Sequence, residues 1–363
     1  MALSDPSKCG ARNESQLHTN FNRVIATPFP SMKITVLGAG AWGTALAISL
    51  AQRHQVTLWA RNPAQLAEMR SSGKNQRYLP DIPLPPTLKL EADFNIALID
   101  VEMIVLAVPI SALRDTLGKI ATLSTPVAVI WLCKGFETET ALLAHQVVAE
   151  VLPNTFKSGV LSGPSFAEEV AKGLPTALVL ASSDIEFARL AAQNLHNPRL
   201  RIYTSSDVIG VEVGGAVKNV LAIAAGISDG MGFGYNTRAA LLTRGLSEMT
   251  RLGIKMGGLA ETLGGLSGVG DLILTCTGDL SRNRKVGLLL AQKHTLPSIL
   301  RELGHVAEGV YSVRAVHQLV TQLKVDMPIC LAVYRILYEG VDAANAVEGL
   351  LNRIPDTEFP DTQ

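Results

Sequence analysis

The sequence predicts an α/β fold in which a doubly wound sheet is followed by a mostly α-helical second domain. From about residue 33 to about residue 206, short apolar runs alternate with stretches of helical composition, as in parallel strands joined by helices. After residue 206, long apolar-periodic stretches follow with few β-branched runs. A glycine-rich turn directly after the first apolar run supports the same assignment.

Length and charge set the limits within which a function is sought. The chain has 363 residues, 47% of them hydrophobic and 18% charged, which is enough material for two domains. We expect the first domain over residues 32–206 and the second over 207–353, with tails at 1–31 and 354–363. Lys plus Arg and Asp plus Glu both number 32, so no basic excess points to nucleic acid or an anionic membrane.

The first tail and the cysteines point to a cytoplasmic protein. Residues 1–31 are rich in Ser, Asn, Pro and Arg and lack an apolar run, so we expect a disordered tail and no secretory signal. The four cysteines show no CxxC or Cys/His ligand spacing. Reduced thiols without a metal centre are the simplest interpretation.

The strands of the first domain are indicated by continuous Val, Ile and Leu runs, which suit strands buried on both faces of a parallel sheet. We expect strands at 34–37, 55–59, 103–108, 127–132, 177–181 and 200–203, and a first helix at 44–52. In the second domain we expect helices near 208–228, 237–252, 281–292, 310–322 and 329–338.

The most apolar long stretch, 208–227, contains Glu212, Lys218 and Asn219. Charged residues in the middle of a span argue against a membrane helix, so no membrane span is expected.

Residues 38–43 read GAGAWG, a GxGxxG pattern between the first strand and the first helix. In that context Gly38 permits a tight turn, Gly40 lets the backbone approach a pyrophosphate, and Gly43 lets helix and strand pack closely. The helix N-terminus then favours the bound anion. The pattern predicts a Rossmann-type, dinucleotide-binding domain; a purely structural glycine turn is the alternative.

Arg61 follows the second strand, where an acidic residue would select NAD by accepting hydrogen bonds from the adenine ribose. An arginine there can pair with a 2′-phosphate, which favours NADP. The alternative is an exposed arginine without a contact.

Lys218 lies inside an almost wholly apolar helical stretch. A lysine is rarely buried without a partner, and desolvation lowers its pKa toward the range useful for acid/base work. The alternative is a side chain that extends its ammonium to the surface.

Two further segments carry polar or charged groups in patterns that suit a functional site. Residues 264–271 form a second glycine-rich stretch ending in Asp271, with Thr275 one helical turn later. Asp271 near Lys218 would orient the ammonium; a helix N-cap is the alternative. Residues 281–285 read SRNRK, a cap residue and three cations that suit a phosphate clamp or else a solvated face.

Together these segments resemble the NAD(P)-dependent glycerol-3-phosphate dehydrogenases of the bacterial biosynthetic kind. The resemblance runs in order and spacing from about residue 33 to about residue 352. Its segments are 38–43, 133–135 (CKG), 161–167 (LSGPSFA), 212–226, 263–285 and 307–309 (AEG).

The resemblance implies roles at matching positions. Lys218 is the expected catalytic acid/base, with Lys134 and Asp271 as further catalytic groups. The implied substrate contacts are Lys134, Gly163, Ser165, Lys218, Asn219, Asp271, Thr275, Ser281, Arg282 and Asn283. The implied coenzyme contacts are Gly38, Gly40, Ala41, Trp42, Gly43, Arg61, Lys134, Ala167, Arg282, Val306 and Glu308.

The implied activity is the reversible reduction of dihydroxyacetone phosphate to sn-glycerol 3-phosphate, which supplies glycerophospholipid synthesis. The coenzyme is NADP or NAD, with NADPH favoured by Arg61, and family members are commonly homodimers. Two rivals stay open. A 6-phosphogluconate or hydroxyacid dehydrogenase would share the fold but lack the segments at 163–165 and 281–283. A non-enzymatic NAD(P) sensor would bind coenzyme without needing Lys218.

Overall fold

The computed structural model describes residues 30–303 and 307–353. The contacts group Met32–Gln363 into one compact unit. The expected tail at 354–363, and residues 1–29 of the first tail, lie outside the described residues. The boundary between two domains near residue 206 stays a prediction, since Met32–Gln363 forms one unit.

The main sheet has eight strands in the order β10-β9-β8-β7-β6-β1-β2-β5. The six strands from β5 to β8 give the order 3-2-1-4-5-6 of a doubly wound dinucleotide-binding sheet. A separate hairpin pairs β3 with β4. The strands are β1 (Lys33–Leu37), β2 (Gln55–Trp59), β3 (Lys74–Asn75), β4 (Leu79–Pro83), β5 (Lys89–Glu91), β6 (Met103–Leu106), β7 (Ala128–Trp131), β8 (Ser158–Ser162), β9 (Thr176–Ala181) and β10 (Leu200–Ser205).

The sheet is parallel from β5 to β8, but β9 pairs antiparallel with β8, and β10 follows the direction of β9. The doubly wound sheet expected from the sequence is therefore mostly parallel, with one antiparallel pairing near this edge. An apolar run such as Thr176–Ala181 specifies a strand, but the direction depends on how the preceding loop returns to the sheet. The strands β5 and β8 were not among those expected.

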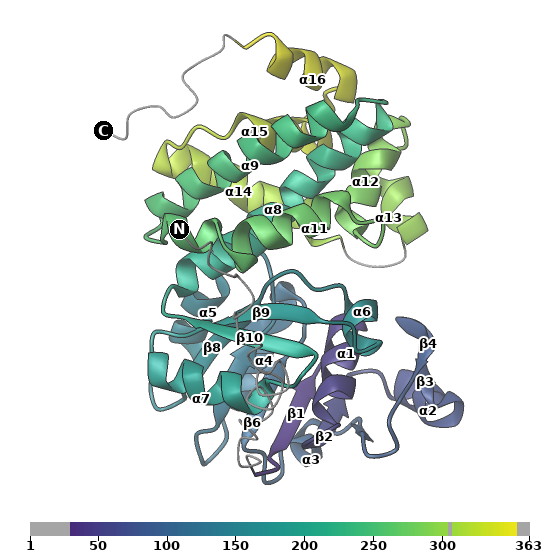
Figure 1. Ribbon diagram of the computed structural model, residues 1–363, viewed down its shortest axis with the longest axis vertical. Coiled ribbons are helices and arrows are strands. Elements are labelled where there is room, and N and C mark those ends of the chain that lie inside the picture. The colour runs from purple at the N-terminus through teal and green to yellow at the C-terminus, as the bar shows by residue number, and fades with distance from the viewer. Residues whose placement is uncertain (1–29, 304–306, 354–363) are drawn as a thin grey trace, which may run out of the picture. The chain divides into compact units, whose positions relative to one another are not determined.

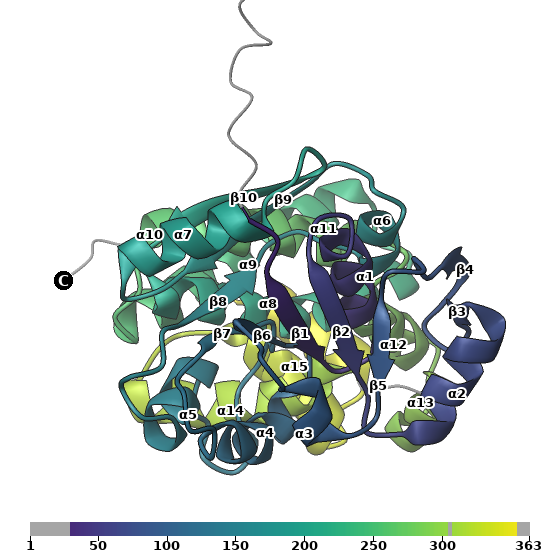
Figure 2. The same ribbon diagram turned by 90° about the horizontal axis from the view of Figure 1, so that it is seen from below.

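Helices cover both faces of this sheet. Along β6, Val105 belongs to the buried cluster that includes α1 and α7, whereas Ile104 and Leu106 belong to the cluster that includes α4 and α5. Figure 2 shows α4 and α5 on one side of the sheet and α7 on the other. Burial on both faces explains why these strands read as continuous apolar runs. The helices of this part are α1 (Ala41–Leu50), α2 (Pro63–Ser72), α3 (Phe94–Ala97), η2 (Ile110–Ala112), α4 (Leu113–Ile120), α5 (Ala144–Val151), α6 (Ala167–Ala171) and α7 (Ile185–Leu195).

From residue 208 onward the described chain is helical, as expected, and packs around α8 (Figure 1). All five expected helices form, with ends that differ by a few residues. The elements are α8 (Val208–Gly230), α9 (Tyr235–Lys255), α10 (Ala260–Leu263), η3 (Leu266–Gly270, a π-helix), α11 (Asp271–Thr277), α12 (Arg282–Ala291), α13 (Leu296–Leu303), α14 (Glu308–Leu323), α15 (Pro328–Tyr338) and α16 (Ala343–Leu351).

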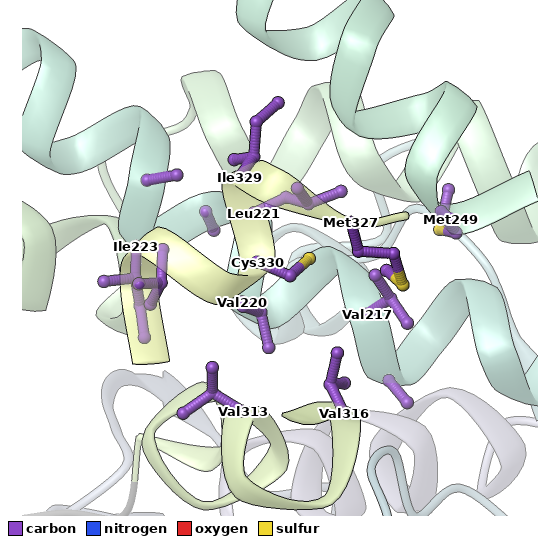
Figure 3. Packing of buried hydrophobic residues seen from close by; sticks show 14 of the residues in the cluster. Val217, Val220, Leu221, Ile223, Met249, Val313, Val316, Met327, Ile329 and Cys330 are labelled. Atoms are coloured by element: carbon purple, nitrogen blue, oxygen red, sulfur yellow. The ribbon is translucent and has the colours of Figure 1, made fainter. Parts of the chain in front are cut away.

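The helix α8 is the core of this part. By length and composition it could cross a membrane, but 89% of its most apolar window is buried inside the protein. Figure 3 shows its side chains facing those of other helices, including Val220 and Leu221 of α8 with Val313 of α14 and Ile329 of α15. Such enclosure on all sides explains the uniform hydrophobicity of the helix.

The crossing of α8 with α12 is unusually close. A Cβ atom added at Gly226 would lie 2.0 Å from the Arg284 carbonyl oxygen, and one at Gly287 would lie 2.1 Å from that of Ile223. Backbone therefore meets backbone, which brings the start of α12 beside the middle of α8, where Lys218 and Asn219 lie.

Candidate active site

The turn after β1 has the geometry that the GxGxxG pattern predicts. Gly38 has a φ of +119°, and a Cβ atom there would lie 2.5 Å from the Ala107 carbonyl oxygen. A Cβ atom at Gly43 would lie 2.0 Å from the carbonyl oxygen of Gly38. Larger residues at either position would push the turn away from β6 or from α1.

Gly40, the second glycine of the GxGxxG pattern, faces open space. Within the described part of the chain, no atom lies within 4 Å of a Cβ atom added at Gly40. Gly40 is the N-cap of α1, and no described side chain caps the helix there. The first-turn N–H groups of α1 are thus available to an anion, so these residues fit the pyrophosphate of a dinucleotide.

Lys218 is buried in α8, with 7% of the residue exposed. Its ammonium donates a hydrogen bond to the Asp271 carboxylate and one of 2.9 Å to the hydroxyl oxygen of Thr275. The side chain therefore does not extend to the surface. Asp271 is the first residue of α11 and gives its carboxylate to Lys218, so the N-cap interpretation of Asp271 is wrong.

A second ammonium reaches the same carboxylate from the sheet. Lys134 follows β7, and its Nζ lies 2.6 Å from Oδ2 of Asp271 and 3.3 Å from the carbonyl oxygen of Gly163. Two lysines from different layers thus share one buried carboxylate, which leaves the cluster with one net positive charge when both ammoniums are protonated.

The charges in this cluster shift one another's proton affinities. Burial lowers the pKa of Lys218 to about 8, and the positive charge of Lys134 acts in the same direction, while Asp271 raises it. Burial alone would raise the pKa of Asp271, but the ammoniums of Lys134 and Lys218 hold it below its ordinary value. The result is a persistent carboxylate beside a lysine that can exchange its proton near neutral pH.

A chain of amide hydrogen bonds links the start of α12 to α8 and α14. The Asn283 side chain donates to Oδ1 of Asn219 at 3.0 Å and accepts from the N–H of Gly309 at the same distance. Ser281 caps α12 by accepting from the N–H of Arg284. Asn283 is thereby bonded to Asn219, the residue that follows Lys218 in α8.

The three cations of the basic run do not act together. Arg284 pairs with Asp229 at 2.8 Å, and Lys285 lies 3.5 Å from Glu302. Arg282 is exposed and makes no ion pair with any residue in the described ranges 30–303 and 307–353. Only Arg282 of this run is therefore free to bind an incoming anion at the start of α12.

Comparisons with known proteins agree with this arrangement. The model for the N-terminus of NAD-dependent glycerol-3-phosphate dehydrogenase matches residues 33–188, and that for its C-terminus matches 207–348. Glycerol-3-phosphate dehydrogenase [NAD(P)+] of Thiobacillus denitrificans is 59% identical over 328 residues, which is 90% of this chain and 100% of the relative. The enzyme of the same name from Nitrosospira multiformis is 58% identical over 332 residues, again 90% and 100%.

The chain belongs to the NAD-dependent glycerol-3-phosphate dehydrogenase family. The crystal structure of glycerol-3-phosphate dehydrogenase from Coxiella burnetii matches with a TM-score of 0.85 and 43% identity, covering 89% of this chain and 99% of that one. The resemblance and the fold class expected from the sequence are confirmed.

Ser165, Ala167 and Glu308 are three further positions that the dehydrogenase resemblance singled out. Ser165 donates to the carbonyl oxygen of Gly163 at 3.1 Å, in the loop between β8 and α6, and Ala167 begins α6. Glu308 begins α14, and burial raises the pKa of its carboxyl group while Arg282 opposes that rise.

Most of the coenzyme contacts implied by the dehydrogenase resemblance fall on described residues. Ala41 and Trp42 form the first turn of α1, and Arg61 is exposed just after β2. The predicted contact at Val306 lies outside the described residues.

Two groups near the dehydrogenase site were not predicted from the sequence. Glu212, buried in α8, accepts from the Trp131 ring N–H at 2.7 Å and from the backbone N–H of His145 at 3.0 Å. Glu212, like Lys218, is a charged residue within an apolar helical stretch, so the same sequence pattern could have predicted it. Asn75, which contacts the turn at Gly38–Gly43, lies in a polar stretch where no local pattern marks it.

Proposed function

We propose that the chain catalyses the reversible reduction of dihydroxyacetone phosphate to sn-glycerol 3-phosphate with NADPH or NADH. Family membership makes it an NAD(P)-dependent oxidoreductase. The observation that supports the substrate most directly is the buried cluster in which Lys134 and Lys218 share Asp271. Such a cluster suits a reaction in which a ketone oxygen gains negative charge and then a proton.

Lys218 is the proposed proton donor. When bound, the coenzyme would supply a hydride to C2 of the ketone. The Lys218 ammonium then stabilises the developing alkoxide and transfers one proton to it, which leaves a neutral amine. With a pKa of about 8, the same amine accepts the proton again in the oxidising direction. Thr275 and Asp271 hold its Nζ in place.

Lys134 and Asp271 have supporting roles. Lys134 keeps a second positive charge near the ketone, and Asp271 prevents the two ammoniums from repelling each other in a buried space. The backbone carbonyl of Gly163 accepts a further hydrogen bond from Lys134, which fixes the ammonium relative to the loop that carries Ser165.

The substrate phosphate is proposed to bind at the start of α12. Arg282 is exposed there without an ion pair among the described residues, and Ser281 and Asn283 stand on either side of it. A free guanidinium beside a helix N-terminus is a strong phosphate site. The amide chain from Asn283 to Asn219 then sets the distance from this site to Lys218.

An assay of the purified chain tests this function. NADPH oxidation should require dihydroxyacetone phosphate, and the reverse reaction should require sn-glycerol 3-phosphate. NADPH oxidation with a 2-keto acid in place of dihydroxyacetone phosphate, or NADP+ reduction with 6-phosphogluconate in place of sn-glycerol 3-phosphate, would support the rival dehydrogenases. Coenzyme binding without turnover of any of these substrates would support the sensor.

Arg61 is proposed to select NADPH over NADH. Because it is exposed after β2, Arg61→Asp should place a carboxylate where the 2′-phosphate binds. KM for NADPH should rise by about tenfold or more, as expected for loss of a charge-assisted contact, while KM for NADH stays nearly unchanged. Arg199→Asp, at an exposed position before β10, is the matched control. Equal effects on both coenzymes would mean that Arg61 does not contact the 2′-phosphate.

The cellular setting is proposed on chemical grounds. We expect a cytoplasmic homodimer whose product serves glycerophospholipid synthesis, because glycerol 3-phosphate is the backbone of those lipids. The burial of α8 supports a chain that works outside the bilayer. Size-exclusion chromatography with light scattering would test the dimer.

A further inference from the structure

The hairpin formed by β3 and β4 packs against α1, the helix that follows the glycine-rich turn. Its Leu79 and Ile82 are buried in a small apolar cluster with Ala45 and Ile48 of α1, the helix that begins at the glycine-rich turn. The hairpin is therefore placed against the outer side of that turn, although its sequence carries none of the expected motifs.

Asn75 of this hairpin donates two hydrogen bonds from one side-chain amide. Its Nδ2 lies 3.1 Å from the carbonyl oxygen of Ala39 and 2.8 Å from the hydroxyl oxygen of Thr44. Gln65 of α2 donates to the same Ala39 carbonyl at 2.8 Å. Two side-chain amides thus converge on the one carbonyl that lies between Gly38 and Gly40.

The orientation of this carbonyl determines the orientation of the next N–H. A trans peptide is planar, so its C=O and N–H point in opposite directions. Because Asn75 and Gln65 hold the Ala39 carbonyl on the hairpin side, the Gly40 N–H is directed to the other side of the turn. Gly40 faces open space: no described atom lies within 4 Å of a Cβ atom placed on it.

Burial of the Asn75 side chain lowers the stability of the fold, because its amide oxygen has no hydrogen-bond partner in the described structure. Asn75 is 1% exposed, and its Oδ1 is buried without a hydrogen-bond partner in the described structure. A buried unsatisfied acceptor is destabilising, so an apolar residue would serve packing alone at least as well. The two hydrogen bonds that the amide donates, to Ala39 and Thr44, explain why an asparagine stands at this position.

We propose that Asn75, together with Gln65, is a positioning residue that orients the Gly40 N–H toward the coenzyme pyrophosphate. The inference rests on the proposed coenzyme role of residues 38–43. It predicts a contribution to the binding of NADPH and NADH alike, because both carry the same pyrophosphate.

Titration of the purified chain with each reduced coenzyme, followed by fluorescence, tests the proposal. Asn75→Ala should raise Kd for NADPH and for NADH by a similar factor, about tenfold, as expected when a hydrogen bond to a charged group is lost. Gln65→Ala, which leaves the Asn75 bonds intact, should raise both by a smaller factor. Arg61→Asp differs in affecting NADPH alone.

Asn197→Ala is the matched control. The Asn197 amide donates to the Ser49 hydroxyl at 2.9 Å, so it binds the same helix α1 near its far end. This variant should lower the melting temperature without changing either Kd. Unchanged coenzyme affinity in folded Asn75→Ala would overturn the proposal; if that variant does not fold, unchanged affinity in Gln65→Ala would overturn it. Failure of the wild-type chain to bind either coenzyme would instead refute the proposed function.

Discussion

Lys218, Asp271 and Lys134 show how single residues acquire chemistry from their surroundings. Lysine is an ordinary surface base with a pKa of 10.5, but burial in α8 lowers the pKa of Lys218 to about 8. Asp271 limits this fall in the pKa of Lys218, because its negative charge favours the protonated ammonium. The cluster thereby holds, at a buried position, a proton that is available near neutral pH.

Replacement of Lys218 by methionine separates a catalytic role from a structural one. Lys218→Met keeps length and apolar packing but removes the charge and the proton. We expect kcat to fall by about 10²–10⁴-fold, as is typical for a general acid/base. Stability should be unchanged or higher, because a buried charge is removed and Asp271 keeps Lys134 as its partner. Single-turnover kinetics, NADPH titration and thermal melting on one sample decide the point.

The control for this variant is Lys157→Met, which removes a lysine paired with Asp184 at the surface and should leave kcat unchanged.

A second test of Lys218 is the dependence of kcat on pH. Reduction needs protonated Lys218, so kcat for reduction should decline as pH rises through about 8. Near-normal turnover in folded Lys218→Met would exclude Lys218 as the proton donor and leave Lys134 as the next candidate.

Arg282 is the residue on which phosphate recognition is expected to depend. Arg282→Ala removes a charge-assisted contact, so kcat/KM for dihydroxyacetone phosphate should fall by an amount equivalent to about 2–3 kcal/mol. Lys285→Ala is the matched control, since Lys285 already lies near Glu302. Unchanged steady-state kinetics in Arg282→Ala would place this arginine on a solvated face.

At the scale of elements, the start of α15 is secured from another helix. Glu248 of α9 is 1% exposed and accepts from the N–H groups of Ile329 and Cys330 at 2.6 and 3.0 Å. These are N–H groups of the first turn, which have no partner within their own helix. One carboxylate therefore caps α15 and joins it to α9.

Glu248→Ala should destabilise the fold without touching the active site. Two buried N–H groups lose their acceptor, which costs about 1–3 kcal/mol, so the melting temperature should fall while KM for both substrates is retained. Burial raises the pKa of Glu248 from 4.5 to about 7. Its contribution to stability is therefore fully present below pH 4.5 and declines as pH rises through about 7.

Denaturant melts at several pH values measure this effect. The stability difference between the unchanged chain and Glu248→Ala should be larger at about pH 5 than at about pH 8. Glu261→Ala, at an exposed position in α10, should show no such difference. A constant difference across this range would mean that the proton affinity of Glu248 is not raised in the folded chain.

At the scale of the whole molecule, the described contacts that build the site all fall within the unit Met32–Gln363. The family models begin at residue 33, and the relatives align with 90% of the chain. A chain begun at Met32 should therefore keep both its melting temperature and its kcat/KM. A large loss of either in a side-by-side comparison with the full chain would show that residues 1–31 contribute to folding or binding.

Local patterns alone were enough to predict most of the architecture. Apolar runs marked six of the ten strands found in the described residues, and the glycine pattern marked the turn before α1. Lys218 was noticed as a charge in an apolar helix. Each of these patterns spans only a few residues, because the periodicities of strands and helices are local properties of the sequence. Short or polar strands such as β3 and β5 lack that signal and were missed.

The tertiary structure alone decided which groups meet. Asp271 lies 53 residues from Lys218 and 137 from Lys134 along the chain, and the convergence of these groups follows from how α8, α11 and the end of β7 pack. The same holds for Arg284, which forms an ion pair with Asp229. It also holds for Asn75, which the β3-β4 hairpin places beside the Ala39 carbonyl. Contacts between distant residues depend on helix crossings and strand directions, which the local hydrophobic pattern of a segment does not encode.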